Sequence, residues 1–392
     1  MGRAFRLPVF DYLLLKLAAR CNLNCTYCYW FRDASVYEKP KVLTEEAEGA
    51  LLVKLEEHIL RYGLKNFSIL FHGGEPLLFG KARMVRLADA LRELEGRTGC
   101  SIHLSITTNG VLIDDEWASV FRFYRIGTTL SIDGPPELHD LARVDHAGRG
   151  SYGKVTAALE TLRRYGIEPG ILAVCRPAED PRRLVRHFVE ELGIRGFDVL
   201  IPDATHQEQP APIAPYYKEL FDTWYDEMGP LGVRIRFAHA LLKGVLGGES
   251  HLESIGYGPI QTCAMLTDGS LEPLDVLRIA GYQATRTQVS ILTHTFQDVT
   301  ADPVWRRAFD AASSLSEACT ACEYRRACGG GFLPHRWSEA RGYDNPSVYC
   351  ADLKEIFDHV WSRVVPDLRV TVGTRRLPLA QFVDEPGSAV PV

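Results

Sequence analysis

The sequence predicts an α/β fold, in which a parallel sheet forms an open, partial (β/α)6 barrel and a cysteine-rich C-terminal module follows it. From about residue 11 to residue 202, short apolar runs alternate with longer segments of helical period, which is the pattern of repeated βα units. Six such units fit an open barrel better than a closed one of eight strands. After residue 258 the composition shifts to cysteine, glycine and aromatic residues, which favours a small module held together by metal.

Six apolar segments are expected to be strands covered on both faces, because each is short and rich in Leu, Ile, Val or Phe. They are Tyr12–Ala18, Phe67–Phe71, Ile102–Ile106, Thr128–Ile132, Gly170–Val174 and Phe197–Ile201. Between the first two, Leu51, Leu55 and Ile59 fall on one face of an expected helix. Thr44 is the expected N-cap of this helix.

The chain is expected to divide into three parts. A polar, proline-rich segment ends the βα region, and two amphipathic helical stretches come after it. We therefore expect a barrel at 1–202, a helical bridge at 203–257 and a cysteine-rich domain at 258–392. Because the first cysteine motif begins at Cys21, we expect no separate N-terminal domain for binding a leader peptide.

Charge and hydropathy exclude several classes of partner. The net charge is -6, so no overall basic field exists to hold nucleic acid or an anionic membrane. No apolar run reaches the roughly 18 residues of a membrane span, and the N-terminus lacks the order of a signal peptide. We expect a cytoplasmic protein, in which the 10 cysteines are thiolate ligands, catalytic groups or buried small residues rather than disulfides.

A first group of cysteines stands at the end of the first expected strand. Cys21, Cys25 and Cys28 have the spacing C-x3-C-x2-C. Three thiolates without a fourth ligand do not complete a tetrahedral zinc site, but they can hold three irons of a 4Fe-4S cluster and leave the fourth iron open. An incomplete zinc knuckle and three unrelated buried cysteines are the alternatives.

This spacing, with Tyr27 just before the last cysteine, resembles the radical S-adenosylmethionine (SAM) superfamily. The resemblance covers residues 11 to about 202 and implies that the open iron binds SAM and that a 5′-deoxyadenosyl radical abstracts hydrogen from substrate. After the second expected strand, Gly73, Gly74 and Glu75 match the segment that binds the amino group of SAM in the family. The two glycines would let the backbone approach the ligand, and the carboxylate is suited to an ammonium group. Taken alone, this segment would be a common turn.

Two further motifs follow the third and fourth expected strands. The resemblance implies that Thr108 and Asn109 make polar contacts to SAM, that Ser131 touches its ribose and that Arg143 pairs with its carboxylate. Singly, Ser131 and Arg143 are more often a strand-end hydroxyl and a surface arginine. All the motifs lie at the carboxyl ends of expected parallel strands, the face on which α/β barrels build their sites.

A second group of cysteines lies near the C-terminus. Cys319, Cys322, Cys328 and Cys350 supply four thiolates, and their spacing alone fits a structural zinc as well as a cluster. The arrangement resembles the SPASM extension of radical SAM enzymes, which implies an auxiliary 4Fe-4S cluster.

This group departs from the family pattern at two positions. Phe332 and Leu274 stand where the family has cysteines. We therefore expect one auxiliary cluster and not two, with Cys263 as a leftover thiol or an unexpected ligand.

Asp275 follows Leu274, at the position where formylglycine-generating relatives carry a general base. A buried carboxylate beside substrate can have its pKa raised toward the working pH and accept a proton. The alternative is a cap in a turn.

The C-terminal segments GGGFLPHRW and YDNPSVYC resemble maturases of ribosomally made peptides, which join an aromatic ring carbon to a nearby β-carbon. The resemblance implies a peptide maturase that forms such a cyclophane cross-link on a precursor peptide, with a flavodoxin or ferredoxin as electron donor. The alternative enzyme is a sulfatase-maturating oxidase that generates formylglycine. A zinc-stabilised binding module without catalysis is the third possibility.

Overall fold

The computed structural model describes residues 9–250, 252–256, 260 and 262–372, which form two compact units. The first unit takes its described residues from 1–173 and 259–310, and the second takes its described residues from 174–258 and 311–392. In the part of the chain that the structure describes, no helix is long and apolar enough to cross a membrane.

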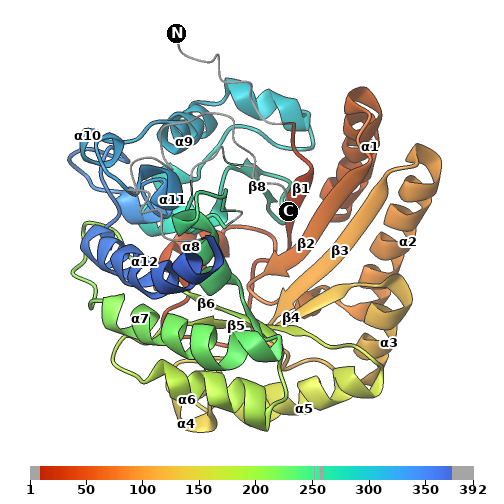
Figure 1. Ribbon diagram of the computed structural model, residues 1–392. Helices are drawn as coiled ribbons and strands as arrows, with labels where there is room; N and C mark the ends of the chain where they lie inside the picture. The colour runs from red at the N-terminus through yellow and green to blue at the C-terminus, as the bar shows by residue number, and fades with distance from the viewer. Residues whose placement is uncertain (1–8, 251, 257–259, 261, 373–392) are drawn as a thin grey trace. The chain divides into compact units, whose positions relative to one another are not determined.

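The first unit is built on a sheet with the strand order β5-β4-β3-β2-β1-β8-β9 (Figure 1). All neighbours are parallel except β8 and β9, which pair antiparallel. The strands are β1 (Tyr12–Ala18), β2 (Asn66–Gly73), β3 (Ser101–Thr108), β4 (Gly127–Ser131), β5 (Gly170–Val174), β8 (Thr262–Met265) and β9 (Leu271–Glu272). The carboxyl ends of the parallel strands β1 to β5 and β8 lie at one edge of the sheet, where the loops that carry the motifs begin.

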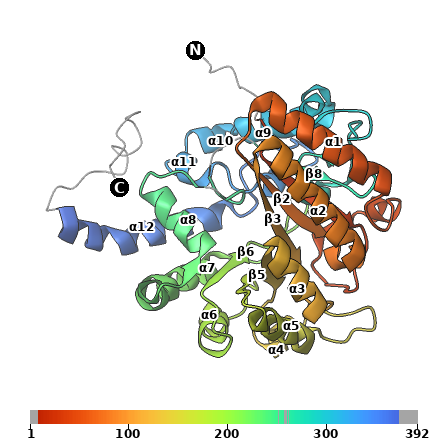
Figure 2. The same cartoon turned by 90° about the vertical axis from the view of Figure 1, so that its right-hand side faces the viewer.

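Helices α1, α2 and α3 cover one face of strands β1 to β4 (Figure 2). The helices of this part of the chain are α1 (Glu45–Tyr62), α2 (Lys81–Thr98), α3 (Asp115–Tyr124), α4 (Pro136–His139), α5 (Tyr152–Arg164) and α9 (Pro303–Ser313). Short 3-10 helices follow several loops, namely η1 (Tyr29–Arg32), η2 (Ala34–Tyr37), η3 (Pro76–Phe79), η7 (Asp275–Ala280), η8 (Tyr282–Ala284) and η9 (Phe296–Ala301).

Helix α1 forms as its sequence predicts. The Thr44 hydroxyl accepts a hydrogen bond from the Ala47 backbone N–H at 3.2 Å, and Gly63 ends the helix in the left-handed conformation. Leu51, Leu55 and Ile59 are buried on one face. The expected N-cap and core face are therefore confirmed.

The second unit is mostly helical. Its elements are α6 (Pro181–Arg186), the π-helix η4 (His187–Glu191), β6 (Gly196–Leu200), α7 (Ala214–Thr223), the π-helix η5 (Trp224–Met228), η6 (Gly229–Leu231), β7 (Arg234–Ile235), α8 (Arg236–Val245), α10 (Glu317–Thr320), α11 (Arg325–Cys328), η10 (Leu333–Arg336) and α12 (Cys350–Val372). Helix α12 packs on α7 and α8, and β7 pairs in parallel with β6.

The α/β class with a parallel sheet is confirmed, and all six expected strands form within two residues of their expected bounds. Strands β8 and β9 were not expected. Because β8 pairs with β1, the described part of 259–310 joins the first unit rather than the cysteine-rich module. The three-part division stays a prediction. The two compact units of the structure have other boundaries in the sequence than the three expected parts.

Candidate active site and cysteine clusters

The loop after β1 brings Cys21, Cys25 and Cys28 together, each partly buried. Burial raises the pKa of all three thiols, that of Cys25 to about 11. The Asn109 side-chain amide lies 3.6 Å from the Cys21 sulfur, and the Leu23 backbone N–H donates to the same sulfur at 3.3 Å. Buried thiols of this kind become thiolates only with a strong positive charge beside them, which iron would supply.

The two glycines of the segment after β2 serve chain packing. A Cβ atom at Gly73 would lie 2.3 Å from the Ala18 carbonyl oxygen, and one at Gly74 would lie 2.4 Å from the Arg20 carbonyl oxygen. The Gly74 N–H donates to Ala18 and the Glu75 N–H donates to Arg20. These glycines therefore let the segment lie directly against the start of the cysteine loop, and the expectation that they admit a ligand stays untested.

Glu75 is fully buried at the edge of the sheet. Its carboxylate accepts hydrogen bonds from the Leu77 N–H at 3.0 Å, the Thr108 hydroxyl at 2.7 Å and the Asn109 N–H at 2.9 Å. Burial nevertheless raises the pKa of Glu75 to about 7. The structure thus joins Glu75, Thr108 and Asn109 in one network beside Cys21, as their shared strand edge predicts. Their contacts to SAM remain a prediction.

Arg143 is buried and paired with a carboxylate that we did not predict. Its Nε and Nη2 donate to the two oxygens of Asp133 at 2.9 and 3.2 Å. The Tyr27 hydroxyl donates to Asp133 at 2.5 Å, and the guanidinium lies 5.4 Å from the Tyr27 ring. Although burial opposes it, Asp133 raises the pKa of Arg143. Ser131, at the end of β4, is 9% exposed. The reading of Arg143 as a solvated surface residue is therefore wrong, while its pairing with SAM is still a prediction.

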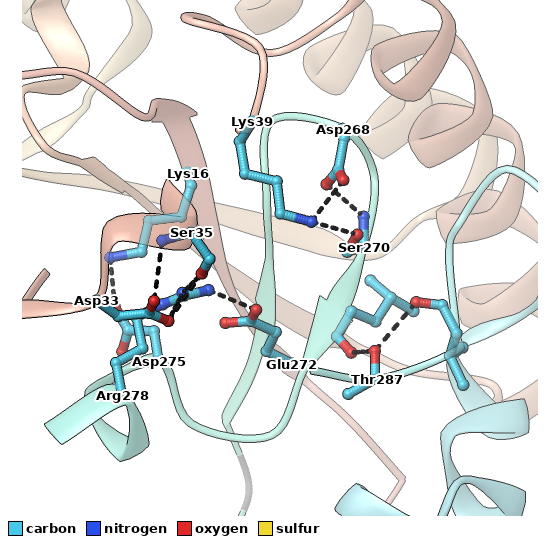
Figure 3. Close-up of polar contacts among 12 residues, drawn as sticks. Lys16, Asp33, Ser35, Lys39, Asp268, Ser270, Glu272, Asp275, Arg278 and Thr287 are labelled. Atoms are coloured by element: carbon cyan, nitrogen blue, oxygen red, sulfur yellow. Dashed lines mark hydrogen bonds and ion pairs between the residues drawn. The ribbon is translucent and has the colours of Figure 1, made fainter. Parts of the chain in front are cut away.

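Asp275, at the start of η7, lies in a buried polar cluster (Figure 3). Lys16 of β1 forms an ion pair with Asp275, and the Tyr29 hydroxyl donates to the same carboxylate at 2.5 Å. The Lys16 ammonium also lies 3.1 Å from His72 Nδ1. Burial alone would raise the pKa of Asp275, but Lys16, His72 and the Tyr29 hydrogen bond bring it down to about 2.

The expected upward shift for Asp275 is therefore wrong, because a buried cation faces the carboxylate. Burial lowers the pKa of His72 to about 3 and also lowers that of Lys16, against the pull of Asp275. At neutral pH Asp275 is a carboxylate beside a neutral imidazole. Since Tyr29 directly follows Cys28, Asp275 is tied to the cysteine loop by a single residue.

A second group of buried ion pairs surrounds Arg278 and shares the Trp30 ring with the group around Asp275. Figure 3 shows Arg278 between Asp33 and Glu272, and its guanidinium contacts the two carboxylates at 3.0 and 2.5 Å. The guanidinium of Arg278 and the ammonium of Lys16 lie 4.5 and 4.3 Å from the ring of Trp30. These contacts fix the segment after the cysteine loop against η7, so the position of Asp275 does not depend on one bond.

Lys16, Asp133 and Tyr29 are the members of this site that sequence reasoning missed. A lysine inside the apolar strand YLLLKLA is a usable signal, because a buried ammonium needs a partner. Asp133 sits in the SIDG motif next to Ser131, but its pairing with Arg143 depends on the fold of the following loop.

In the second unit, all four predicted thiols line one cavity. Cys319, Cys322, Cys328 and Cys350 come from α10, the loop after it, the end of α11 and the start of α12. Burial raises the pKa of Cys328 to about 12 and also raises that of Cys350, and the neighbouring thiols add to both shifts. The expected grouping of these four residues is confirmed as geometry.

The spacing of the thiols bears on what they hold. Among the described residues, no three Cys, His, Asp or Glu side chains converge closely enough for a single metal ion. Zinc needs four ligands about 2.3 Å from one centre, whereas each thiolate of a 4Fe-4S cluster binds a different iron. The cluster prediction assigns three thiolates to the first cysteine group and four to the second.

The positions that depart from the family pattern are filled by apolar packing. Leu274 is 4% exposed just before η7, and the Phe332 ring packs edge-on against His335 at 5.2 Å. Cys263 is fully buried on β8, and burial raises its pKa. The number of auxiliary clusters stays a prediction.

Comparison with known proteins places these features in a family context. Residues 15–191 match the Radical SAM superfamily. The chain is 27% identical over 374 residues to the cysteine-type anaerobic sulfatase-maturating enzyme of Clostridium perfringens (strain 13 / Type A), covering 92% of this chain and 98% of the relative. It is 35% identical over 187 residues to the serine-type enzyme of Bacteroides thetaiotaomicron, covering 46% of this chain and 43% of that relative.

A solved structure described as native anSMEcpe with bound AdoMet and Cp18Cys peptide has a similar fold. The TM-score is 0.80 at 26% identity, covering 92% of this chain and 99% of that chain. The likeness extends through the cysteine-rich C-terminal region, as the SPASM resemblance predicts.

These findings overturn the cyclophane prediction. That prediction depended on two short C-terminal segments, whereas the similarity to sulfatase-maturating enzymes spans nearly the whole chain. In the structure, residues of those segments support local folding. Arg336 donates to four backbone carbonyls, and the Asn345 amide donates to the Arg336 and Gly342 carbonyls and the Ser338 hydroxyl.

Proposed function

The chain is a radical SAM enzyme, and we propose that it converts a cysteine of a protein substrate to formylglycine. The third possibility from the sequence, a zinc-stabilised binding module without catalysis, is therefore set aside. The observation that carries the proposal is the position of Asp275. This buried carboxylate accepts a hydrogen bond from Tyr29, the residue after Cys28, in a chain that resembles sulfatase-maturating enzymes over 92% of its length.

Two sets of residues would hold the cofactors. Cys21, Cys25 and Cys28 would ligate a 4Fe-4S cluster with one open iron, and Glu75 and Arg143 would bind the amino and carboxylate groups of SAM. The Glu75 carboxylate has about four acceptor positions, of which the protein fills three. One position is left for an ammonium group. Bound together, cluster and SAM supply a 5′-deoxyadenosyl radical that takes a hydrogen atom from the substrate β-carbon.

The protein's own task is then to remove a proton and an electron. The substrate thiol would lose its S–H proton to Asp275 as the carbon–sulfur double bond forms, and the auxiliary cluster would supply the acceptor for the remaining electron. Water then replaces sulfur, which departs as hydrogen sulfide, and an aldehyde remains. The ion pair with Lys16 keeps Asp275 deprotonated, and the hydrogen bond from Tyr29 orients its carboxylate to accept the proton.

A cysteine substrate suits this base better than a serine. Because the pKa of Asp275 is lowered to about 2, it is a weak base, and a thiol with an ordinary pKa near 8.5 is far more acidic than a hydroxyl. The relative that aligns over nearly the whole chain is of cysteine type, and the serine-type relative aligns over less than half.

The electron acceptor would be the cluster held by Cys319, Cys322, Cys328 and Cys350. Because Leu274 and Phe332 occupy positions where the family has further cysteine ligands, this single auxiliary cluster would accept the electron. A flavodoxin or ferredoxin would reduce the first cluster in the cell.

The test is an assay of the anaerobically reconstituted enzyme with SAM and dithionite. The substrate is a synthetic peptide that copies the modification site of a sulfatase, with the target cysteine replaced by serine or alanine in matched peptides. We expect one aldehyde for each 5′-deoxyadenosine with the cysteine peptide, a slower reaction with serine and none with alanine. Formation of 5′-deoxyadenosine without aldehyde in the cysteine peptide would contradict the proposal.

A further inference from the structure

Arg336, at the end of η10, is a buried cation with an unusual set of partners. The residue is 3% exposed. Its Nε donates to the Tyr343 and Asn345 carbonyls at 3.1 Å, its Nη1 donates to Ala311 at 2.8 Å and its Nη2 donates to Ser314 at 2.8 Å. All four acceptors are backbone carbonyl oxygens.

Within the described residues, no carboxylate forms an ion pair with this guanidinium. The charge of Asp344 acts on Arg336, but Asp344 forms its ion pair with Arg341 at 3.1 Å, and its side chain is 64% exposed. Burial lowers the pKa of Arg336, yet an arginine stays protonated in proteins. A full positive charge is thus buried with only dipoles around it, which is costly unless an anion lies nearby.

The guanidinium lies beside the cavity of the second cysteine group. A Cβ atom at Gly330 would be 3.7 Å from Arg336 Nη1, and Gly330 lines the same cavity as the four thiols. Ionised Cys319 and Cys328 would favour the charged form of Arg336 and raise its pKa, against the lowering by burial. Four thiolates around a 4Fe-4S core carry a net negative charge, which is the missing counter-charge.

We propose that Arg336 is the buried counter-charge of the auxiliary cluster and raises its reduction potential. A positive charge in a low-dielectric surrounding favours the more negative, reduced state of the cluster. The cluster thereby becomes a better acceptor for the electron that substrate oxidation releases. This role needs the auxiliary cluster but not the formylglycine product, so each can fail without the other.

The alternative is that Arg336 only ties together the backbone of 311–314 and 343–345. That role depends on hydrogen bonds rather than charge. It predicts that weakening the bonds lowers cluster content or thermal stability and leaves the potential unchanged.

The experiment is a redox titration of the full-length protein reconstituted with the auxiliary cluster, followed by the electron paramagnetic resonance signal of that cluster. To isolate that signal, all variants carry alanine at Cys21, Cys25 and Cys28. Arg336→Gln should lower the equilibrium constant for one-electron reduction at least tenfold, which is a shift of 59 mV to more negative potential for one electron. Arg336→Lys keeps the charge and should stay within about threefold of the parent protein.

Arg325→Gln is the matched control, because Arg325 lines the same cavity but is half exposed and therefore screened by water. It should shift the equilibrium constant less than threefold. A parental potential in Arg336→Gln would overturn the proposal. If Arg336→Gln binds no cluster, Arg336→Lys decides, since a tenfold fall in that charge-preserving variant would also overturn it.

Discussion

In the described part of the first unit, the buried cations Lys16, Arg143 and Arg278 each have a carboxylate partner, whereas Arg336 of the second unit is buried and donates to four backbone carbonyls. Paired charges set the geometry of side chains and largely cancel each other's field. An unpaired charge leaves its field to act on whatever occupies the neighbouring cavity. In the account proposed above, the first unit positions and moves a proton, and the second favours the arrival of an electron.

The largest expected effect separates the two cysteine groups. Replacing Cys21, Cys25 and Cys28 with alanine should abolish 5′-deoxyadenosine formation and reduce the iron content from about eight to about four per chain. Replacing Cys319, Cys322, Cys328 and Cys350 should remove the other four irons and leave SAM cleavage in place. Iron analysis and chromatography of the nucleoside check both results. Loss of SAM cleavage in the second variant would show that the two groups do not act separately.

Breaking a pair in the first unit should be costly. Asp133→Ala leaves Arg143 buried without its carboxylate, and the free energy of unfolding should fall by about 3 to 5 kcal/mol. Urea denaturation measures the loss. The surface pair of Lys54 and Glu57 offers the control, since Glu57→Ala should cause no measurable change. A loss as small as that of the control would mean that the Asp133 pair does not stabilise the fold.

A smaller effect is expected for SAM binding. Glu75→Gln keeps the shape of the side chain but removes the charge that would meet the amino group of SAM. Affinity measured by calorimetry should weaken by about 1 to 3 kcal/mol with the first cluster intact. Glu116→Gln, on the exposed face of α3, should bind SAM as the parent does. Unchanged affinity in Glu75→Gln would mean that Glu75 does not bind SAM and only supports the fold through its hydrogen bonds with Leu77, Thr108 and Asn109.

The smallest effect concerns a neutral buried group of the second unit. Burial lowers the pKa of His335 to about 3, so the folded state resists a proton that the unfolded state takes up below about pH 6.5. Stability should therefore fall as the pH drops from 6.5 toward 3, with a limiting slope of about 1.4 kcal/mol per pH unit from this residue. His335→Phe should flatten the profile, measured as the thermal midpoint between pH 5 and 7. An equal slope in both proteins would place the titration elsewhere.

Local sequence patterns were sufficient to predict many features of this molecule. The six strands, the Thr44 cap and both cysteine groups follow from residue type and spacing, because each depends on neighbours in sequence. Glu75, Thr108 and Asn109 also converge as expected, since the carboxyl ends of neighbouring parallel strands share one edge.

Long-range partners were not predictable in the same way. Asp275 was singled out, but its pKa shift was given the wrong sign because Lys16 lies 259 positions earlier in the chain. Strand β8 has only four residues, and nothing in them points to β1 as its neighbour. The cyclophane prediction failed for a different reason, because it depended on two short segments, GGGFLPHRW and YDNPSVYC, whereas the similarity to sulfatase-maturating enzymes covers 92% of the chain.

The most direct test of the account replaces Asp275 with asparagine, which keeps the shape and removes the base. With the cysteine peptide, 5′-deoxyadenosine formation and hydrogen transfer from the β-carbon should continue, while aldehyde falls about 10²-fold. Asp268→Asn is the control, because this carboxylate pairs with Lys39 in a nearby turn and should leave both products unchanged. If aldehyde and 5′-deoxyadenosine fall together in Asp275→Asn, or if both survive, Asp275 is not the proton acceptor and the account is wrong at its centre.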